Sequence, residues 1–369
     1  MRFQHLKIIV AGGLLIACEK SGLPISYETE HLRIATDLEH PLCAGDLIAF
    51  EGVIGRVEDE LGFSMESKVS VSIWSDEGWG AVVGEYCGRD RSVIGCTSYR
   101  ENAIYTSLSA VEHELVHAAV AIPKLTPFFS EGLADVYGGR RQTRFGITAP
   151  ADNLGLSTTG VDRRTARHFV MWLRETWGSA KLGELARLGK HAVERFDAVY
   201  GLNFAEAEAM YFTEAPYGYP SLDACSGAPL DFADDLGGWR AMLAFDCGAG
   251  EDVRAEGIGM MVRRTFVIPN AGYYSLSTDA DAVLLSRCAT GAIEEPVRLD
   301  EFLDDDVPPS YANELSEMFA LYLGARGETH RGSECVTGAR GQGPKPQSYR
   351  AYYKVSGHRD RAPGACSGS

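Results

Sequence analysis

The stretch HELVHAAVAIPKLTPFFSEGLADVYGG, from His113 to Gly139, decides how the rest of the sequence is interpreted. His113 and His117 are four residues apart, so on a helix both lie on one face, about 40° apart around the axis. Two imidazole nitrogens placed in this way can bind one tetrahedral metal ion. Glu114 would lie beside that ion, near enough to take a proton from a water. A helix that carries two histidines by chance is the alternative, and the short motif alone does not exclude it.

The residues after the histidines offer a third ligand. A catalytic zinc site has three protein ligands and keeps its fourth position open. Glu131 follows His117 after thirteen residues, which leaves room for a turn at Pro123–Pro127 and a second helix packed beside the first. Asp135 lies one helical turn beyond Glu131, where its carboxylate could hold the free N–H of a ligand imidazole.

These residues together resemble a known family. His113-Glu114-x-x-His117 with Glu131-x-x-x-Asp135 is similar to the motif of the gluzincin metallopeptidases, and the short spacing with EGLAD resembles their peptidase MA-like branch. The resemblance implies a zincin-like fold, a small sheet with active-site helices. It also implies roles for the matching residues, with Zn²⁺ bound by His113, His117 and Glu131, Glu114 as the general base, and Asp135 as the residue that orients a ligand histidine.

The resemblance covers residues 69–211 and departs from the family in one respect. Gluzincins usually add a tyrosine or histidine that stabilises the oxyanion of the tetrahedral intermediate. Where related chains often have a tyrosine, this sequence reads VDRRTARHF, so Arg163, Arg164 or His168 could supply the donor. We take His168 as the candidate oxyanion donor. The strand NAIYT, 102–106, could pair with an extended peptide as edge strands do, or have a structural role only.

The N-terminus resembles an export signal. A basic start precedes an apolar run, Ile8–Ala17, that is about half as long as a bilayer-spanning helix. The run ends in LIAC at Cys18, which resembles the lipobox of bacterial lipoproteins, in which the cysteine is acylated and becomes the mature N-terminus. A diacylated cysteine would anchor the protein to a membrane. We therefore expect a signal peptide over 1–17 and a lipid-anchored protein of the cell envelope; an ordinary signal peptide cut nearby is the alternative.

Charge and cysteine content agree with export. The formal net charge of −16 argues against nucleic acid and against a direct electrostatic contact with an anionic membrane. Nine cysteines occur, and the eight that remain without Cys18 form an even number that suits disulfides in an oxidising compartment. Two pairs flank short loops and are candidate local disulfides, Cys87 with Cys96 and Cys225 with Cys247.

Hydrophobic patterns predict an α+β chain with two domains. Period-two alternation and helical spacing favour strands at 31–35, 68–74 and 101–109, a helix at 45–61 and a helical region at 162–211. Beyond 222 the pattern changes to short strands, among them RRTFVIP, GYYSLST, AVLLSRC, MFALYLGAR and YRAYYKV. We expect a zincin-like domain at 18–221 followed by a β-sandwich domain at 222–369.

The sequence therefore predicts a secreted, lipid-anchored, zinc-dependent metallopeptidase that acts on protein or peptide substrates. The Met-Glu-Asn run of related aminopeptidases is absent, which favours an endopeptidase. A catalytically inactive binding lipoprotein on a peptidase scaffold is the alternative, because the oxyanion donor is not evident. A structural export-assembly protein without metal would require the ligands, the base and the orienting carboxylate to coincide by chance.

Overall fold

The computed structural model describes two ranges of the chain. The first is 23–222 without 89–92, 123, 140–141 and 144–145, and the second comprises 228–230, 232–233, 238–239, 247, 253–256, 259–267, 282–287 and 318–325. The described residues up to Leu222, apart from Leu42–Gly45, form one compact unit, and those beyond it form a second unit together with Leu42–Gly45. No helix within these ranges is both long and apolar enough to cross a bilayer. The predicted signal peptide and Cys18 lie outside the described residues.

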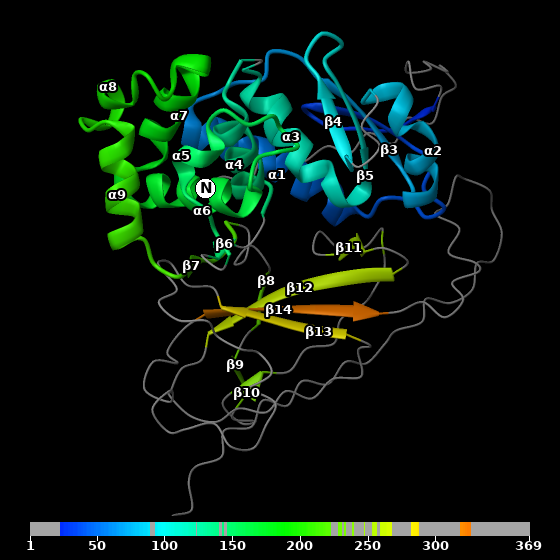
Figure 1. Ribbon diagram of the computed structural model, residues 1–369. Helices are drawn as coiled ribbons and strands as arrows, with labels where there is room; N and C mark the ends of the chain where they lie inside the picture. Colours follow the sequence, from blue (N-terminus) through cyan, green and yellow to red (C-terminus); the bar gives the residue numbers. More distant parts are fainter. Residues whose placement is uncertain are drawn as a thin grey trace, which may run out of the picture. The chain divides into compact units, whose positions relative to one another are not determined.

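A five-stranded mixed sheet forms one side of the first unit (Figure 1). Its order is β1-β2-β3-β5-β4, in which β2, β3 and β5 run parallel and the two outer strands are antiparallel to their neighbours. The central strands β3 and β5 are almost wholly buried. The strands are β1 (Ile25–Glu28), β2 (Leu32–Thr36), β3 (Val69–Trp74), β4 (Gly95–Ser98) and β5 (Ala103–Ser107).

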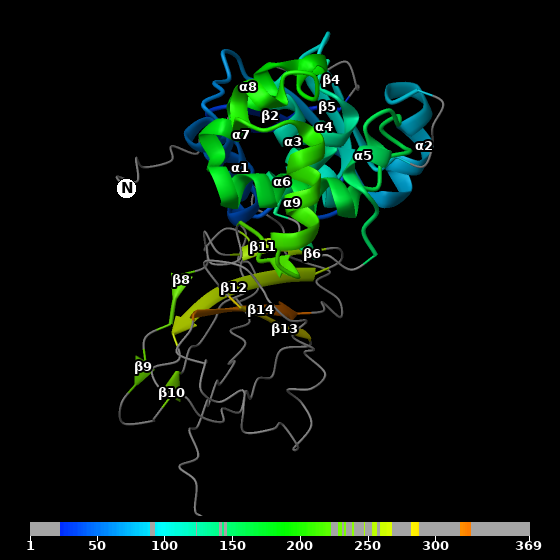
Figure 2. The same cartoon turned by 60° about the vertical axis from the view of Figure 1, so that its left-hand side comes forward.

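Helices make up the rest of this unit. In Figure 1, α5 to α9 gather on the side away from the sheet, and α3 and α4 lie between. Both views have α3 next to β4 and β5 (Figures 1 and 2). The helices are α1 (Ala44–Leu61), α2 (Asp76–Tyr86), α3 (Val111–Val120), α4 (Pro127–Tyr137), α5 (Pro150–Asn153), α6 (Arg163–Trp177), α7 (Ser179–Arg187), α8 (Phe196–Tyr200) and α9 (Phe204–Glu214). The predicted strands, the helix at 45–61 and the helical region at 162–211 are confirmed.

The connection between α3 and α4 determines how these two helices pack. Helix α3 ends at Ala121, whose φ of 46° is left-handed, a conformation that terminates helices. Helix α4 begins at Pro127, whose fixed φ and missing N–H suit the first turn of a helix. On the other side of α4, a Cβ added to Gly132 would stand 2.7 Å from the carbonyl oxygen of Ala166, so glycine allows α4 to lie close against α6. Helix α4 is thereby held between α3 and α6.

Two disulfides occur among the described cysteines. The predicted bond between Cys87 and Cys96 is confirmed, and it joins the end of α2 to β4. The predicted bond between Cys225 and Cys247 is wrong, because Cys247 pairs with Cys43, 204 residues away. Short spacing favours a local disulfide only when the fold brings no distant cysteine closer. The sequence does not reveal which distant cysteines the fold brings together. The other cysteines, Cys18, Cys225, Cys288, Cys335 and Cys366, lie outside the described residues.

The described part of the second unit contains strands. Three of the predicted segments contain strands of one sheet, whose order is β11-β12-β14-β13, with β8 parallel to β12. The segments GYYSLST and YRAYYKV lie outside the described residues, so the β-sandwich stays a prediction. The strands are β8 (Ala228–Pro229), β11 (Val253–Glu256), β12 (Gly259–Val267), β13 (Ala282–Arg287) and β14 (Met318–Ala325), and β9 (Phe232–Ala233) pairs with β10 (Gly238–Trp239). In the first unit, β6 (Gln142–Thr143) pairs with β7 (Gly218–Tyr219).

Candidate metal centre

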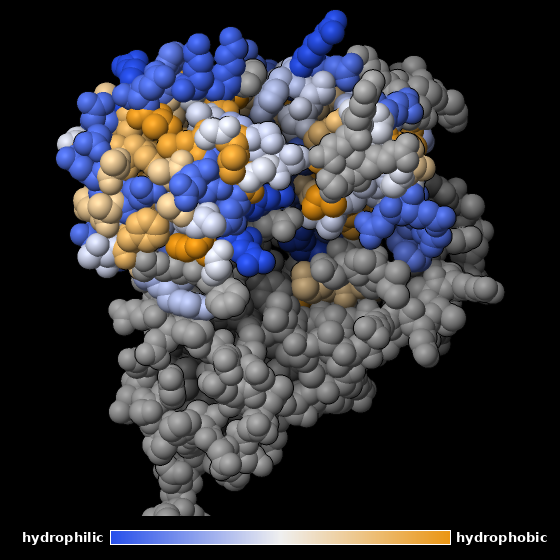
Figure 3. Space-filling view, viewed as in Figure 1, coloured by the Kyte–Doolittle hydropathy of each residue, from blue (hydrophilic) through white to orange (hydrophobic). Residues whose placement is uncertain are grey.

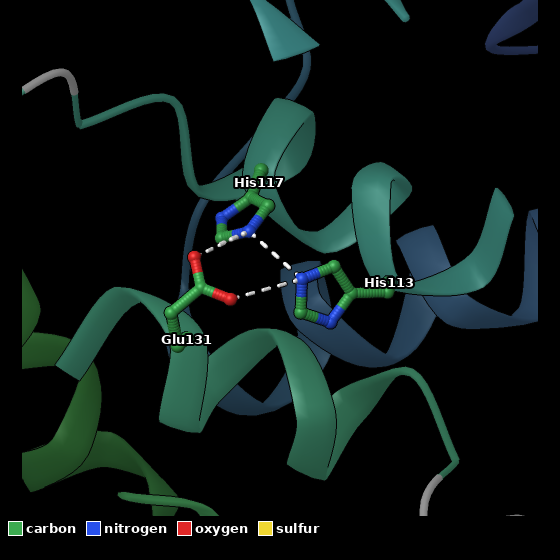
Figure 4. Close-up of side chains that lie close together, drawn as sticks. All are labelled: His113, His117 and Glu131. Atoms are coloured by element: carbon green, nitrogen blue, oxygen red, sulfur yellow. Dashed lines mark hydrogen bonds and ion pairs between the residues drawn. The ribbon is translucent and has the colours of Figure 1, made fainter. Parts of the chain in front are cut away.

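The two histidines of the motif lie on one face of α3. His113 and His117 project toward the same point, and their Nε2 atoms are 3.1 Å apart (Figure 4). The apolar residues of the same helix pack on the other faces, with Val111, Leu115 and Val116 at most 1% exposed. The helix thus buries its hydrophobic side and turns the imidazoles toward α4.

Glu131 completes a group of three. It lies on α4, and its carboxylate oxygens are 3.3 Å from Nε2 of His113 and 3.5 Å from Nε2 of His117. Ligand atoms bound at about 2.0–2.1 Å to a tetrahedral ion are about 3.4 Å apart, and each of these contacts is close to that value, with each histidine facing a different oxygen of the carboxylate. His113 and Glu131 are only 6% and 5% exposed. Two imidazoles and one carboxylate could therefore hold a metal ion.

The outer nitrogen of each imidazole has its own partner. Oδ1 of Asp135 lies 2.9 Å from Nδ1 of His113, and Oγ of Ser130 lies 3.2 Å from Nδ1 of His117. Partners of this kind fix the ring orientation of histidines that bind metals. The sequence predicts the first contact from helical spacing. It does not predict the second, although Ser130 directly precedes Glu131.

The titratable side chains of the site shift one another's pKa values. Burial lowers the pKa of His113, but hydrogen bonds to Asp135 and Glu131 outweigh it and raise this pKa to about 9. Burial likewise raises the pKa of Glu131, and its hydrogen bonds to His113 and His117 overcome this and hold the pKa well below its usual range. The carboxylates are therefore ionised at neutral pH, which is the state a metal ligand needs.

Arg163 lies at the group, whereas His168 does not. The first residue of α6, Arg163 donates to both carboxylate oxygens of Asp135, and its Nη2 is 2.9 Å from Nδ1 of His113. His168 is fully buried further along α6, and its Nδ1 lies 2.8 Å from the hydroxyl of Tyr211. An imidazole enclosed in the core cannot meet a substrate that enters from solvent. His168 is therefore a poor oxyanion donor, and Arg164 is exposed.

No family model matches this sequence, and no curated protein matches it.

Glu114 stands apart from the three ligand candidates and faces the sheet. It is 5% exposed, and Oε2 accepts a hydrogen bond of 2.9 Å from the hydroxyl of Thr97 on β4. The same hydroxyl lies 3.2 Å from the carbonyl oxygen of Glu114. The sequence contains no signal for this contact, because it depends on the packing of α3 against β4.

The strand β4 is the outer strand of the sheet on this side. Of the two alternatives for 102–106, pairing with a peptide as an edge strand is contradicted, because β5 pairs with β3 on one side and β4 on the other. Among the described strands, none pairs with the outer side of β4. Ile94 and Tyr99, which flank β4, are 42% and 40% exposed. The outer strand next to Glu114 thus is one that the sequence pattern did not predict.

Tyr99 reaches the metal group from the end of β4. It lines a small pocket together with His117 and Ser130, and with Val116, Val120, Ile122, Leu125 and Leu133. Burial raises the pKa of its phenol to about 12, and the negative charges of Glu114 and Glu131 add to the rise. At neutral pH the phenol is therefore a neutral hydrogen-bond donor beside the site.

Proposed function

We propose that this chain is an exported zinc metallopeptidase of the gluzincin type, with His113, His117 and Glu131 as the zinc ligands. The observation that carries the proposal is the buried group of these three side chains, in which the two Nε2 atoms are 3.1 Å apart and lie 3.3 and 3.5 Å from the two carboxylate oxygens of Glu131. Zinc fits the donors, because two imidazoles and one glutamate form a known catalytic set that leaves one position open. When bound, zinc supplies a Lewis acid that polarises the scissile carbonyl and makes a water more acidic.

The proposed role of Glu114 is to move a proton. As general base, its carboxylate takes a proton from the attacking water and later passes it to the amine of the leaving fragment. Asp135 keeps His113 in the tautomer and orientation that present Nε2 to the metal. Arg163 and Tyr99 replace His168 as candidate oxyanion donors, since each brings N–H or O–H groups to the site. The charge of Arg163 also balances that of Asp135, which is 1% exposed.

A peptide is the substrate class that fits this arrangement. The outer edge of β4 offers backbone N–H and C=O groups beside Glu114, and an extended peptide can pair with such an edge. The strand is short, so a bound peptide would gain few hydrogen bonds from it and would depend on side-chain contacts as well. The peptidase interpretation thus rests on the metal donors and on a neighbouring edge strand.

The proposed location is the cell envelope, with the chain anchored by acylated Cys18. The disulfides between Cys87 and Cys96 and between Cys43 and Cys247 support an oxidising compartment. The face of the first unit in Figure 3 mixes hydrophilic and hydrophobic side chains. Mass spectrometry of Cys18 in a membrane fraction would identify the anchor.

The decisive variant for this function is Glu114→Gln. Because Glu114 is not a proposed ligand, the variant should keep its zinc and lose about 10²–10⁴-fold in the hydrolysis of casein. Asp135→Asn is the contrasting control, and it should lose about 10–100-fold in zinc affinity or activity. Hydrolysis by Glu114→Gln at the wild-type rate would exclude the proposed base. A zinc-loaded wild type that cleaves neither casein nor a diverse peptide library would favour the binding lipoprotein instead.

A further inference from the structure

Strand β4 packs against the carboxylate of Glu114. The hydroxyl of Thr97 donates to Oε2 at 2.9 Å. The other oxygen, Oε1, lies over Gly95, where an added Cβ would stand 3.0 Å from it and 2.8 Å from Cγ of Glu114. A side chain at Gly95 would therefore crowd this carboxylate as well as Oγ1 of Thr106, which would be 2.6 Å from the added Cβ. Two residues of one strand thus define where Glu114 can lie.

We propose that Thr97 is a positioning residue, which holds Oε2 of Glu114 and leaves Oε1 as the oxygen that accepts the proton. This inference rests on the proposed function, in which Glu114 is the general base. A carboxylate on a flexible side chain can rotate, and a misplacement of about 1 Å in a catalytic group can cost about 10²-fold in rate. The hydrogen bond from Thr97 restricts that rotation.

The sheet fixes the backbone position of Thr97, whose hydroxyl donates to Glu114. Residues 95–98 pair in register with β5, including Thr97 with Ile104, and Ile104 is fully buried. The neighbouring residue Cys96 is bonded to Cys87 at the end of α2. Although no described strand pairs with the outer edge of β4, its inner side and its disulfide fix the backbone from which the hydroxyl projects. The donor is therefore anchored independently of Glu114.

A purely structural role for Thr97 makes different predictions. If the hydroxyl only satisfies a buried carboxylate, its removal would lower stability and leave turnover unchanged. A positioning role lowers kcat while the substrate affinity, the zinc content and the melting temperature stay near those of the wild type. The conservative change to serine keeps the hydroxyl and removes only the methyl group. It therefore distinguishes the effect of the hydrogen bond from the effect of side-chain shape.

The test compares Thr97→Val, Thr97→Ser and Ser98→Ala in the full-length, zinc-loaded protein. Valine has the shape of threonine without the donor, and Ser98 is the matched control because adjacent residues of a strand face opposite sides. We expect Thr97→Val to lose about 10–100-fold in kcat with little change in KM. Thr97→Ser should recover most of the rate, and Ser98→Ala should match the wild type.

A second readout does not depend on turnover. A peptide hydroxamate binds catalytic zinc, and its hydroxyl can donate to the carboxylate of Glu114, so Thr97→Val should weaken its binding by about 10-fold. Unchanged kcat and hydroxamate affinity in Thr97→Val, or an equal loss in Thr97→Ser, would overturn the role of Thr97 alone. Loss of zinc or a collapse of the melting temperature in Thr97→Val would also overturn it. A wild type that neither cleaves peptides nor binds the hydroxamate would overturn the proposed function, and this inference with it.

Discussion

His113 links the proposed metal site to pH. Its pKa is raised to about 9 in the folded chain, because hydrogen bonds to Asp135 and Glu131 outweigh its burial. A histidine whose pKa is higher in the folded than in the unfolded state stabilises the fold. This stabilisation is fully present at pH values below the ordinary histidine pKa of about 6.5. This contribution is lost as the pH rises through about 9. Zinc requires the neutral imidazole, so zinc binding has to remove the proton that stabilises the metal-free protein.

We therefore expect zinc binding at pH 7 to release about one proton per molecule. The apparent zinc affinity should rise with pH until about pH 9, where His113 loses its proton in the metal-free protein. Calorimetric titrations in buffers with different ionisation enthalpies measure the number of protons released. Asp135→Asn removes a bond that raises the pKa, so it should release fewer protons. An affinity that is constant between pH 6 and pH 9 would contradict the protonation state assigned to His113.

The residues of the site differ in how far the sequence predicts them. Helical spacing alone brings His113 and His117 together and puts Asp135 one turn from Glu131, because a helix fixes which side chains share a face. The contact between Thr97 and Glu114 joins a strand to a helix, and no local pattern reports such a contact. The burial of His168 against Tyr211 likewise depends on contacts distant in sequence, which no local pattern reports.

At the scale of elements, the sequence reveals those with strong periodicity. The helix α1 has regular apolar spacing and was predicted within one residue of its bounds. Helix α2 reads DEGWGAVVGEY, and its three glycines lower the helix propensity that sequence patterns depend on. The strand β4 has four residues, GCTS, too few for alternation to be visible. Among the strands that the sequence did not predict, β4 is the one that contacts Glu114.

The disulfide between Cys87 and Cys96 should stabilise the element that contacts the base. The cysteines are 9 residues apart, and closing a loop of this length contributes about 2–3 kcal/mol in the chain-entropy description. Replacing both by serine should lower the free energy of unfolding in urea by about that amount. It should also reduce peptide hydrolysis, because β4 would hold Glu114 less firmly. Equal stability and equal hydrolysis in the double variant would show that this bond has no such role.

At the scale of the whole chain, the described group of candidate metal ligands lies in the first unit. Within the described residues, His113, His117 and Glu131 form the group with metal-ligand spacing. These residues come from two consecutive helices that pack between the sheet and α6. The fold class of the first unit was predictable because its helices and strands are periodic. The second unit was predictable only as a set of strands, since the order in which short strands pair depends on contacts distant in sequence.

Elemental analysis of the purified, tag-free protein tests the central claim most directly. The wild type should hold about one zinc per molecule, and His117→Ala, which removes one of three ligands, should hold almost none at the same free zinc concentration. Glu114→Gln should match the wild type. His191→Ala is the matched control, since this histidine lies on the surface, with its side chain 50% exposed and paired with Glu194. Equal zinc in the wild type and in His117→Ala would contradict a metal centre at this site.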